Sequence, residues 1–154
     1  MRSLAPGCGR AAVQLGVKFR ASVAGTISGI RFYKGPQNTG SHVGSLWTAT
    51  GQRLATVTFA NETASGWQQA TFSSPVSIAA GTTYIASYHA PVGKYSVNEN
   101  YFTTAVTNGP LEAPASGTSG GNGVYAYGPS TAFPTNTFNA SNYWVDVVFN
   151  SATS

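Results

Sequence analysis

Apolar and polar residues alternate with a period of two along much of this chain. The clearest case is residues 13–20, VQLGVKFR, in which apolar side chains occupy every second position. Such a period predicts a β-strand with one buried and one polar face. Similar alternation, or a dense run of β-forming residues, predicts further strands over residues 26–34, 43–50, 53–59, 67–72, 75–78, 82–90, 94–102, 124–127 and 142–150. No window has a convincing helical period of apolar residues.

Turn-forming residues separate these segments at the spacing of about 8–12 residues that is typical of β-sandwiches and barrels. The tight hairpin turn expected at residues 50–52, TGQ, is an example. The sequence therefore predicts an all-β fold, an antiparallel β-sandwich of jelly-roll type with long loops at one end. Residues 1–12 are expected to form an irregular tail, and residues 13–150 a single domain of the 154-residue chain.

Aromatic residues make up 12% of the chain and divide into two groups by their position in this pattern. The inward phase of the strands places Phe19, Phe32, Phe59, Phe72 and Phe149 in the core. Nine others fall out of phase or near loops: Tyr33, Trp47, Trp67, Tyr88, Tyr95, Tyr101, Tyr125, Tyr127 and Trp144. Taken singly, Trp47 and Trp67 are expected to pack in the core or at a sheet edge, since tryptophan is largely buried on average.

Charged residues make up only 8% of the chain, where about 25% is typical. Such a composition is common in secreted β-domains. The net charge is +4, but the eight basic residues are scattered and form no run. A nucleic-acid partner is therefore not expected. No stretch approaches the roughly 20 apolar residues of a membrane helix, so membrane insertion is not expected either.

Several long motifs resemble a known family. They are GVKFR, GIRFYKGPQNTGSHVGSLWTATGQRLATVTF, GWQQATFSSPVSIAAGTTYIASYHAPVGKY, GVYAYG and FPTNTFNASNYWVDVVF, and together they span about residues 13–149. The chain is similar in them to a bacterial family catalogued only as a domain of unknown function. That family occurs in large secreted proteins beside immunoglobulin-like and fibronectin-like repeats. The resemblance implies an extracellular β-sandwich module, although the N-terminal segment has no clear signal peptide.

The four acidic residues give little support to catalysis. Glycosidases commonly place two carboxylates across the scissile bond, but Glu62 and Glu112 lie in predicted loops without an obvious partner. Asp146 lies within the last strand and is predicted to pair with a base on a neighbouring strand, Arg31 or Lys18. The sequence therefore leans against an enzyme. Acids are also too few for a carboxylate-rich calcium cage, which leaves a structural calcium held by backbone oxygens as an open alternative.

The two histidines, His42 and His89, define a second candidate chemistry. A loop and a strand end can converge at one rim of a sandwich, where two imidazoles could hold copper or zinc. With no third histidine, another donor would be needed, and the simpler interpretation is that each ring makes hydrogen bonds.

Aromatic and amide side chains at such a rim also suit a sugar, whose ring stacks on Trp and Tyr while amides bind its hydroxyls. The predicted ligand-binding residues are Asn38, His42, Trp47, Tyr88, His89 and Tyr95. The function predicted from the sequence is a non-catalytic extracellular module that binds a polysaccharide or glycan. A small copper or zinc enzyme using His42 and His89, and a structural or adhesion spacer, remain the alternatives.

Overall fold

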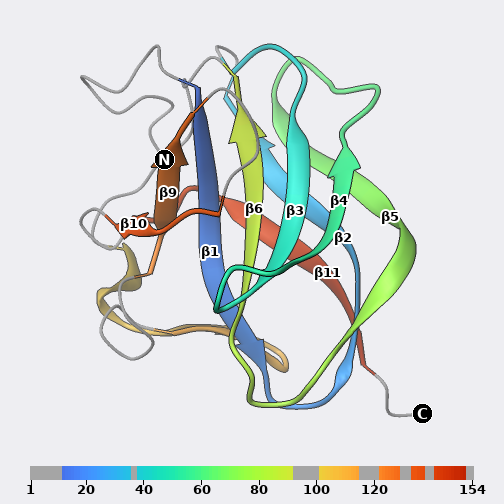
Figure 1. Ribbon diagram of the computed structural model, residues 1–154, viewed down its shortest axis with the longest axis vertical. Helices are drawn as coiled ribbons and strands as arrows, with labels where there is room; N and C mark the ends of the chain where they lie inside the picture. The colour runs from blue at the N-terminus through green and yellow to red at the C-terminus, as the bar shows by residue number, and fades with distance from the viewer. Residues whose placement is uncertain are drawn as a thin grey trace.

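The protein is described by a computed structural model, in which residues 12–35, 38–91, 101–114, 122–128, 133–137 and 141–151 are placed. These residues form two antiparallel β-sheets that pack face to face, which confirms the predicted all-β sandwich. Figure 1 shows the smaller sheet crossing behind the larger one.

The larger sheet has its strands in the order β10-β9-β1-β6-β3-β4. Their bounds are β1 Val13–Ala21, β3 Val43–Thr48, β4 Arg53–Thr58, β6 Tyr84–Ala90, β9 Val124–Tyr127 and β10 Asn136–Thr137. A hairpin of β7 (Val106–Asn108) and β8 (Leu111–Ala113) pairs with the end of β1. The smaller sheet has the order β11-β2-β5, with β2 Gly25–Lys34, β5 Gly66–Ile78 and β11 Val145–Ser151. A 3-10 turn, η1, spans Tyr101–Thr103.

The core lies between the two sheets and follows from the alternation of side chains along each strand. Phe32 of β2 stacks on Tyr88 of β6, with ring centroids 4.1 Å apart and an interplanar angle of 13°. Phe59 meets Phe32 edge-on at 4.9 Å. Gly44 permits this close approach of the sheets, since a Cβ there would lie only 3.0 Å from Ile30. The core is thus fixed by aromatic rings that cross from one sheet to the other.

The outer face of the larger sheet is also partly covered. Trp47, Ile85 and Val124 are buried there and pack against Phe133. The indole nitrogen of Trp47 donates to the Oγ of Ser87 at 2.8 Å. The burial predicted for Trp47 is therefore confirmed, although on the side of the sheet that faces away from the core.

Most of the predicted strands and core positions are confirmed. Of the phenylalanines assigned to the core, four are at most 5% exposed, and Phe149 is partly buried against the same cluster. Residues 67–72 and 75–78 belong to one continuous strand, β5. The short strands β7, β8 and β10 lie in segments for which no strand was predicted. Of the strand predicted over 94–102, residues 94–100 lie outside the described chain, as do residues 1–11 of the predicted tail.

Candidate functional site

The residues predicted to form a ligand-binding rim are buried. Asn38, His42 and Tyr88 are fully buried, while Trp47 and His89 are each 6% exposed. Tyr95 lies outside the described residues. Among the described residues, the predicted rim is therefore not an accessible surface. Asn38, His42 and Tyr88 are buried on the core side of the larger sheet. Trp47 and His89 are buried on its outer side.

Three of these residues do come together, in a buried polar chain. The side-chain amide of Asn38 joins His42, at 2.8 Å from its Nε2, to the hydroxyl of Tyr88 at 3.3 Å. On the other side of the ring, Nδ1 of His42 lies 2.8 and 2.9 Å from the two carboxylate oxygens of Glu62. Lys34, whose side chain is only 9% exposed, completes the chain with Nζ 3.0 Å from the same carboxylate. These polar contacts connect the β2–β3 loop and the β4–β5 loop to the core.

The protonation of His42 follows from its surroundings. Burial lowers the pKa of His42, while the hydrogen bond and charge of Glu62 act in the opposite direction. A neutral ring donates from Nδ1 to Glu62, and its Nε2 then accepts a hydrogen bond. In the structure Nε2 faces the amide oxygen of Asn38, and the amide nitrogen donates to the Tyr88 hydroxyl. This arrangement suits a ring that carries a proton on Nε2, so the neutral ring described above requires the Asn38 amide to be turned by about 180°. Burial also raises the pKa of Tyr88, so its hydroxyl keeps its proton.

The two histidines face opposite sides of the larger sheet. His42 packs against the core rings of Phe32 and Tyr88, with centroids at 4.9 and 6.0 Å. His89 follows Tyr88 on β6 and therefore points away from the core, where its Nε2 donates to the carbonyl of Gly128 at 2.8 Å. The structure therefore does not bring the two rings together, as the alternative of a joint copper or zinc site would require. Within the placed ranges, no group of three or more His, Cys, Asp or Glu side chains is gathered for a metal.

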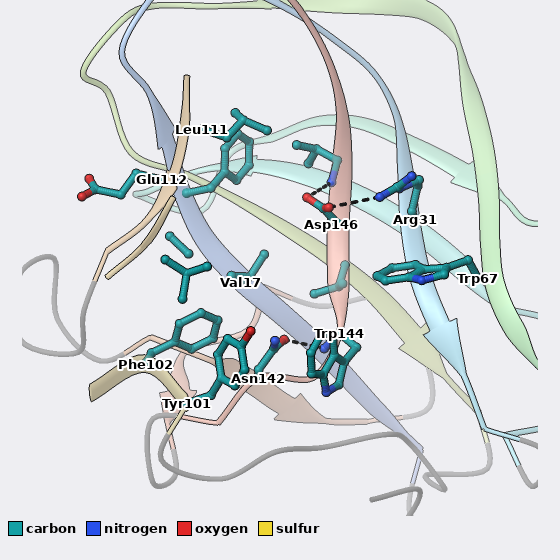
Figure 2. A pocket seen from close by; sticks show the side chains of 15 residues that line it. Val17, Arg31, Trp67, Tyr101, Phe102, Leu111, Glu112, Asn142, Trp144 and Asp146 are labelled. Atoms are coloured by element: carbon teal, nitrogen blue, oxygen red, sulfur yellow. Dashed lines mark hydrogen bonds and ion pairs between the residues drawn. The ribbon is translucent and has the colours of Figure 1, made fainter. Parts of the chain in front are cut away.

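A cleft of about 330 Å³ lies elsewhere, beside β11 at the edge of the smaller sheet. Figure 2 shows Asp146 on β11 between a side formed by Arg31 and Trp67 and a side formed by Leu111 and Glu112. Tyr101, Phe102, Asn142 and Trp144 close the third side. The apolar lining is completed by Val17, Phe19, Val106, Ala113, Val145 and Val147. The cleft therefore combines an apolar base with aromatic and polar walls.

Its aromatic walls are accessible and held in place by their neighbours. Trp67 is 47% exposed and Tyr101 36% exposed, which makes them two of the most exposed large apolar side chains. Tyr33 meets Trp67 edge-on at 5.6 Å, and the guanidinium carbon of Arg31 lies 5.0 Å from the Trp67 ring centroid. Tyr101 and Trp144 make a second edge-on pair at 5.4 Å. Such contacts orient the rings without covering them.

The backbone of Trp144 is in the left-handed region, with φ of 58°. A bulky residue adopts this conformation at a cost of roughly 1–2 kcal/mol. Two hydrogen bonds hold it: the Trp144 N–H donates to Oδ1 of Asn142 at 2.7 Å, and the Trp144 carbonyl accepts from the Tyr33 N–H at 2.8 Å. The indole is consequently directed to the cleft by a specific local geometry.

Charges at the cleft are matched in pairs. Arg31 lies 3.3 Å from Asp146, which confirms the predicted ion pair between neighbouring strands. Glu112 of β8 pairs with Arg20 of β1 at 2.5 Å, where the two residues are opposite each other in the register. The cleft thus offers polar groups without an excess of either sign.

The sequence contains a signal for this cleft that is not evident from single residues. Tyr101, Trp144 and Trp67 all lie out of phase with the core or near loops, but Trp67 was expected to pack. Its exposure follows from the register of β5, in which Gln68 points inward and Trp67 outward opposite Tyr33. The gathering of the three rings depends on η1 and the turn before β11, neither of which has a periodic signature.

The fold and the cleft define a class: a small antiparallel β-sandwich module with an aromatic-walled cleft at the edge of one sheet. The model of the family described as Domain of unknown function (DUF4082) matches residues 5–145, and the chain belongs to that family. No curated protein matches the chain significantly, and neither does any solved structure. In the described residues, no helix has the length and apolar character to cross a membrane.

Proposed function

We propose that this protein is a non-catalytic recognition module that binds carbohydrate in the cleft beside β11. The observation that carries the proposal is the gathering of Trp67, Tyr101 and Trp144 around one apolar cleft. The apolar C–H face of a sugar ring stacks on such rings, and ligand sites in general combine an aromatic lining with a few placed polar groups. Here the polar groups are the Arg31–Asp146 pair and the amide of Asn142.

Trp67 is the main stacking platform in this proposal. The guanidinium of Arg31 lies against its ring, and almost half of the side chain remains exposed. A platform held by a cation and by Tyr33 loses little conformational freedom when a ligand binds, and such preorganisation favours affinity.

The arrangement of the acids favours binding over hydrolysis. A glycosidase uses one carboxyl group as an acid and a second as a base or nucleophile. Among the residues that the structure describes, two carboxylates line the cleft, those of Asp146 and Glu112, and each is engaged by an arginine. Neither stands in the cleft as an isolated acid–base group.

We further propose that the module works outside the cell, as the scarcity of charged residues favours. Immunodetection in cell fractions tests the location: signal in the medium or on the cell surface is expected, and signal confined to the cytoplasm would overturn it.

Retention on a panel of immobilised polysaccharides tests the function. The native protein is expected to be retained on at least one of them, and Trp67→Ala is expected to weaken binding by about 1–2 kcal/mol, roughly ten-fold. Tyr127→Ala is the matched control, because Tyr127 is also 47% exposed but lies on β9 and not in the cleft. No retention on any polysaccharide, or equal retention of native protein and Trp67→Ala, would contradict the proposal and favour a spacer domain.

A further inference from the structure

A second depression, of about 360 Å³, adjoins the cleft along the outer face of β11. The two depressions share Arg31, Leu111, Asp146 and Val147. The second one is completed by Gln69 of β5, by the turn between β7 and β8, and by Val148 and Phe149. The aromatic cleft therefore does not end at the Arg31–Asp146 pair.

We infer that the ligand is an internal stretch of an uncharged polysaccharide chain, which crosses the Arg31–Asp146 pair and occupies both depressions. This inference rests on the proposed function of the cleft and names the class of carbohydrate. One end of the bound stretch stacks on the aromatic walls, and the other lies beside Gln69.

The position of the ion pair supports a ligand that extends across it. The side chains of Arg31 and Asp146 are 38% and 41% exposed, so both can reach a ligand while they remain paired. Together they offer donors and acceptors to hydroxyl groups on either side of the junction. A site for a single terminal sugar would instead be closed beyond this pair.

The paired charges support an uncharged ligand. Each described acid at the two depressions has a basic partner, Arg31 for Asp146 and Arg20 for Glu112. A polyuronate would bring carboxylates against Asp146 and Glu112 without meeting an unpaired cation among the residues described for either depression. Hydroxyl groups incur no such repulsion.

Calorimetric titration with oligomers of rising length tests the inference. The probes are β-1,4-linked oligomers of glucose, xylose and N-acetylglucosamine, from disaccharide to hexasaccharide, with oligogalacturonates as the charged comparison. Affinity is expected to rise with length and then reach a plateau. Gln69→Ala is expected to lower the affinity for the longest oligomer about three- to ten-fold, as loss of a hydrogen bond does, and to leave the disaccharide unaffected.

Gln52→Ala is the control, since Gln52 is an exposed glutamine on the β3–β4 hairpin outside both depressions. Affinity that is independent of length, an unaltered hexasaccharide affinity in Gln69→Ala, or tighter binding of the oligogalacturonates would overturn the inference while the proposed function stands. The absence of binding to every probe, together with no retention on the polysaccharide panel, would remove both.

Discussion

Neutralising Glu62 should destabilise the sandwich far more than neutralising an acid at its surface. Glu62 is 12% exposed and accepts from two buried groups, His42 and Lys34. The substitution Glu62→Gln keeps the shape and one carbonyl oxygen of the side chain but removes its charge. Lys34, with a side chain that is 9% exposed, then keeps its hydrogen bond to the Thr63 carbonyl but loses its counter-charge.

The magnitude follows from the cost of leaving a buried ammonium without its counter-charge. Removing one partner of a buried ion pair costs about 3–5 kcal/mol, and the retained bond to Thr63 reduces this to about 2–3 kcal/mol. For a domain of this size, that loss lowers the melting temperature by about 4–12 °C. Urea denaturation at neutral pH measures the free energy of unfolding directly.

The matched control is Asp146→Asn, the same change of carboxylate to amide in the exposed Arg31–Asp146 pair. Its expected cost is under about 1 kcal/mol, because exposed pairs contribute little. The double variant Lys34→Met/Glu62→Gln should recover part of the loss, since it removes the isolated charge as well. A Glu62→Gln variant no less stable than Asp146→Asn would refute the argument.

Other predictions concern pH, backbone geometry, the strained tryptophan and salt. Burial lowers the pKa of His42 below its ordinary 6.5, so the unfolded chain takes up the proton first as the pH falls. The free energy of unfolding is therefore expected to be full above about pH 6.5 and to fall as the pH drops towards the folded pKa. Unfolding free energies that do not change over this window, or an NMR titration of the ring at its ordinary pKa, would contradict this. Gly123→Ala should cost more than about 2 kcal/mol in denaturation, because φ is 74° and the added Cβ would fall on the Ser141 carbonyl oxygen; a stable variant would show that the turn adapts. Trp144→Gly should change stability by less than about 1 kcal/mol, since relief of the left-handed backbone offsets lost packing, while polysaccharide retention falls; unaltered retention would exclude Trp144 from the site. Retention should change little with added salt, since the ligand is held by stacking and neutral hydrogen bonds; elution by moderate salt would indicate a charged ligand.

Most strands were predictable because burial on one face imposes a period of two, as in β5. Strand β6 is buried on both faces and was predicted from its unbroken run of β-forming residues. The pattern of residues 13–20 corresponds to β1, and the hairpin turn at 50–52 is formed with Gly51 at φ of 103°. The hairpin of β7 and β8 was not predictable, because three-residue strands are too short for a period to be read.

The site was less predictable than the fold, and the reason lies in which face of a strand each side chain occupies. Tyr88 and His89 are neighbours in the chain, and the sequence suggested a common rim for them. Alternation instead sends Tyr88 into the core and His89 to the outer face. Conversely, Trp67 is exposed because the register of β5 places it opposite Tyr33 on the outer face of the smaller sheet. This register depends on pairing between residues that are far apart in the sequence.

The indole N–H resonances give the most direct test of the proposed cleft, since the chain has three tryptophans. Trp67 and Trp144 line the cleft, whereas Trp47 is buried on the outer face of the larger sheet with its N–H bonded to Ser87. On titration with an oligosaccharide of a retained polysaccharide, the Trp67 and Trp144 signals are expected to shift in proportion to binding, and the Trp47 signal to stay in place. A shift of Trp47 alone, or of none of the three, would contradict carbohydrate binding at this cleft.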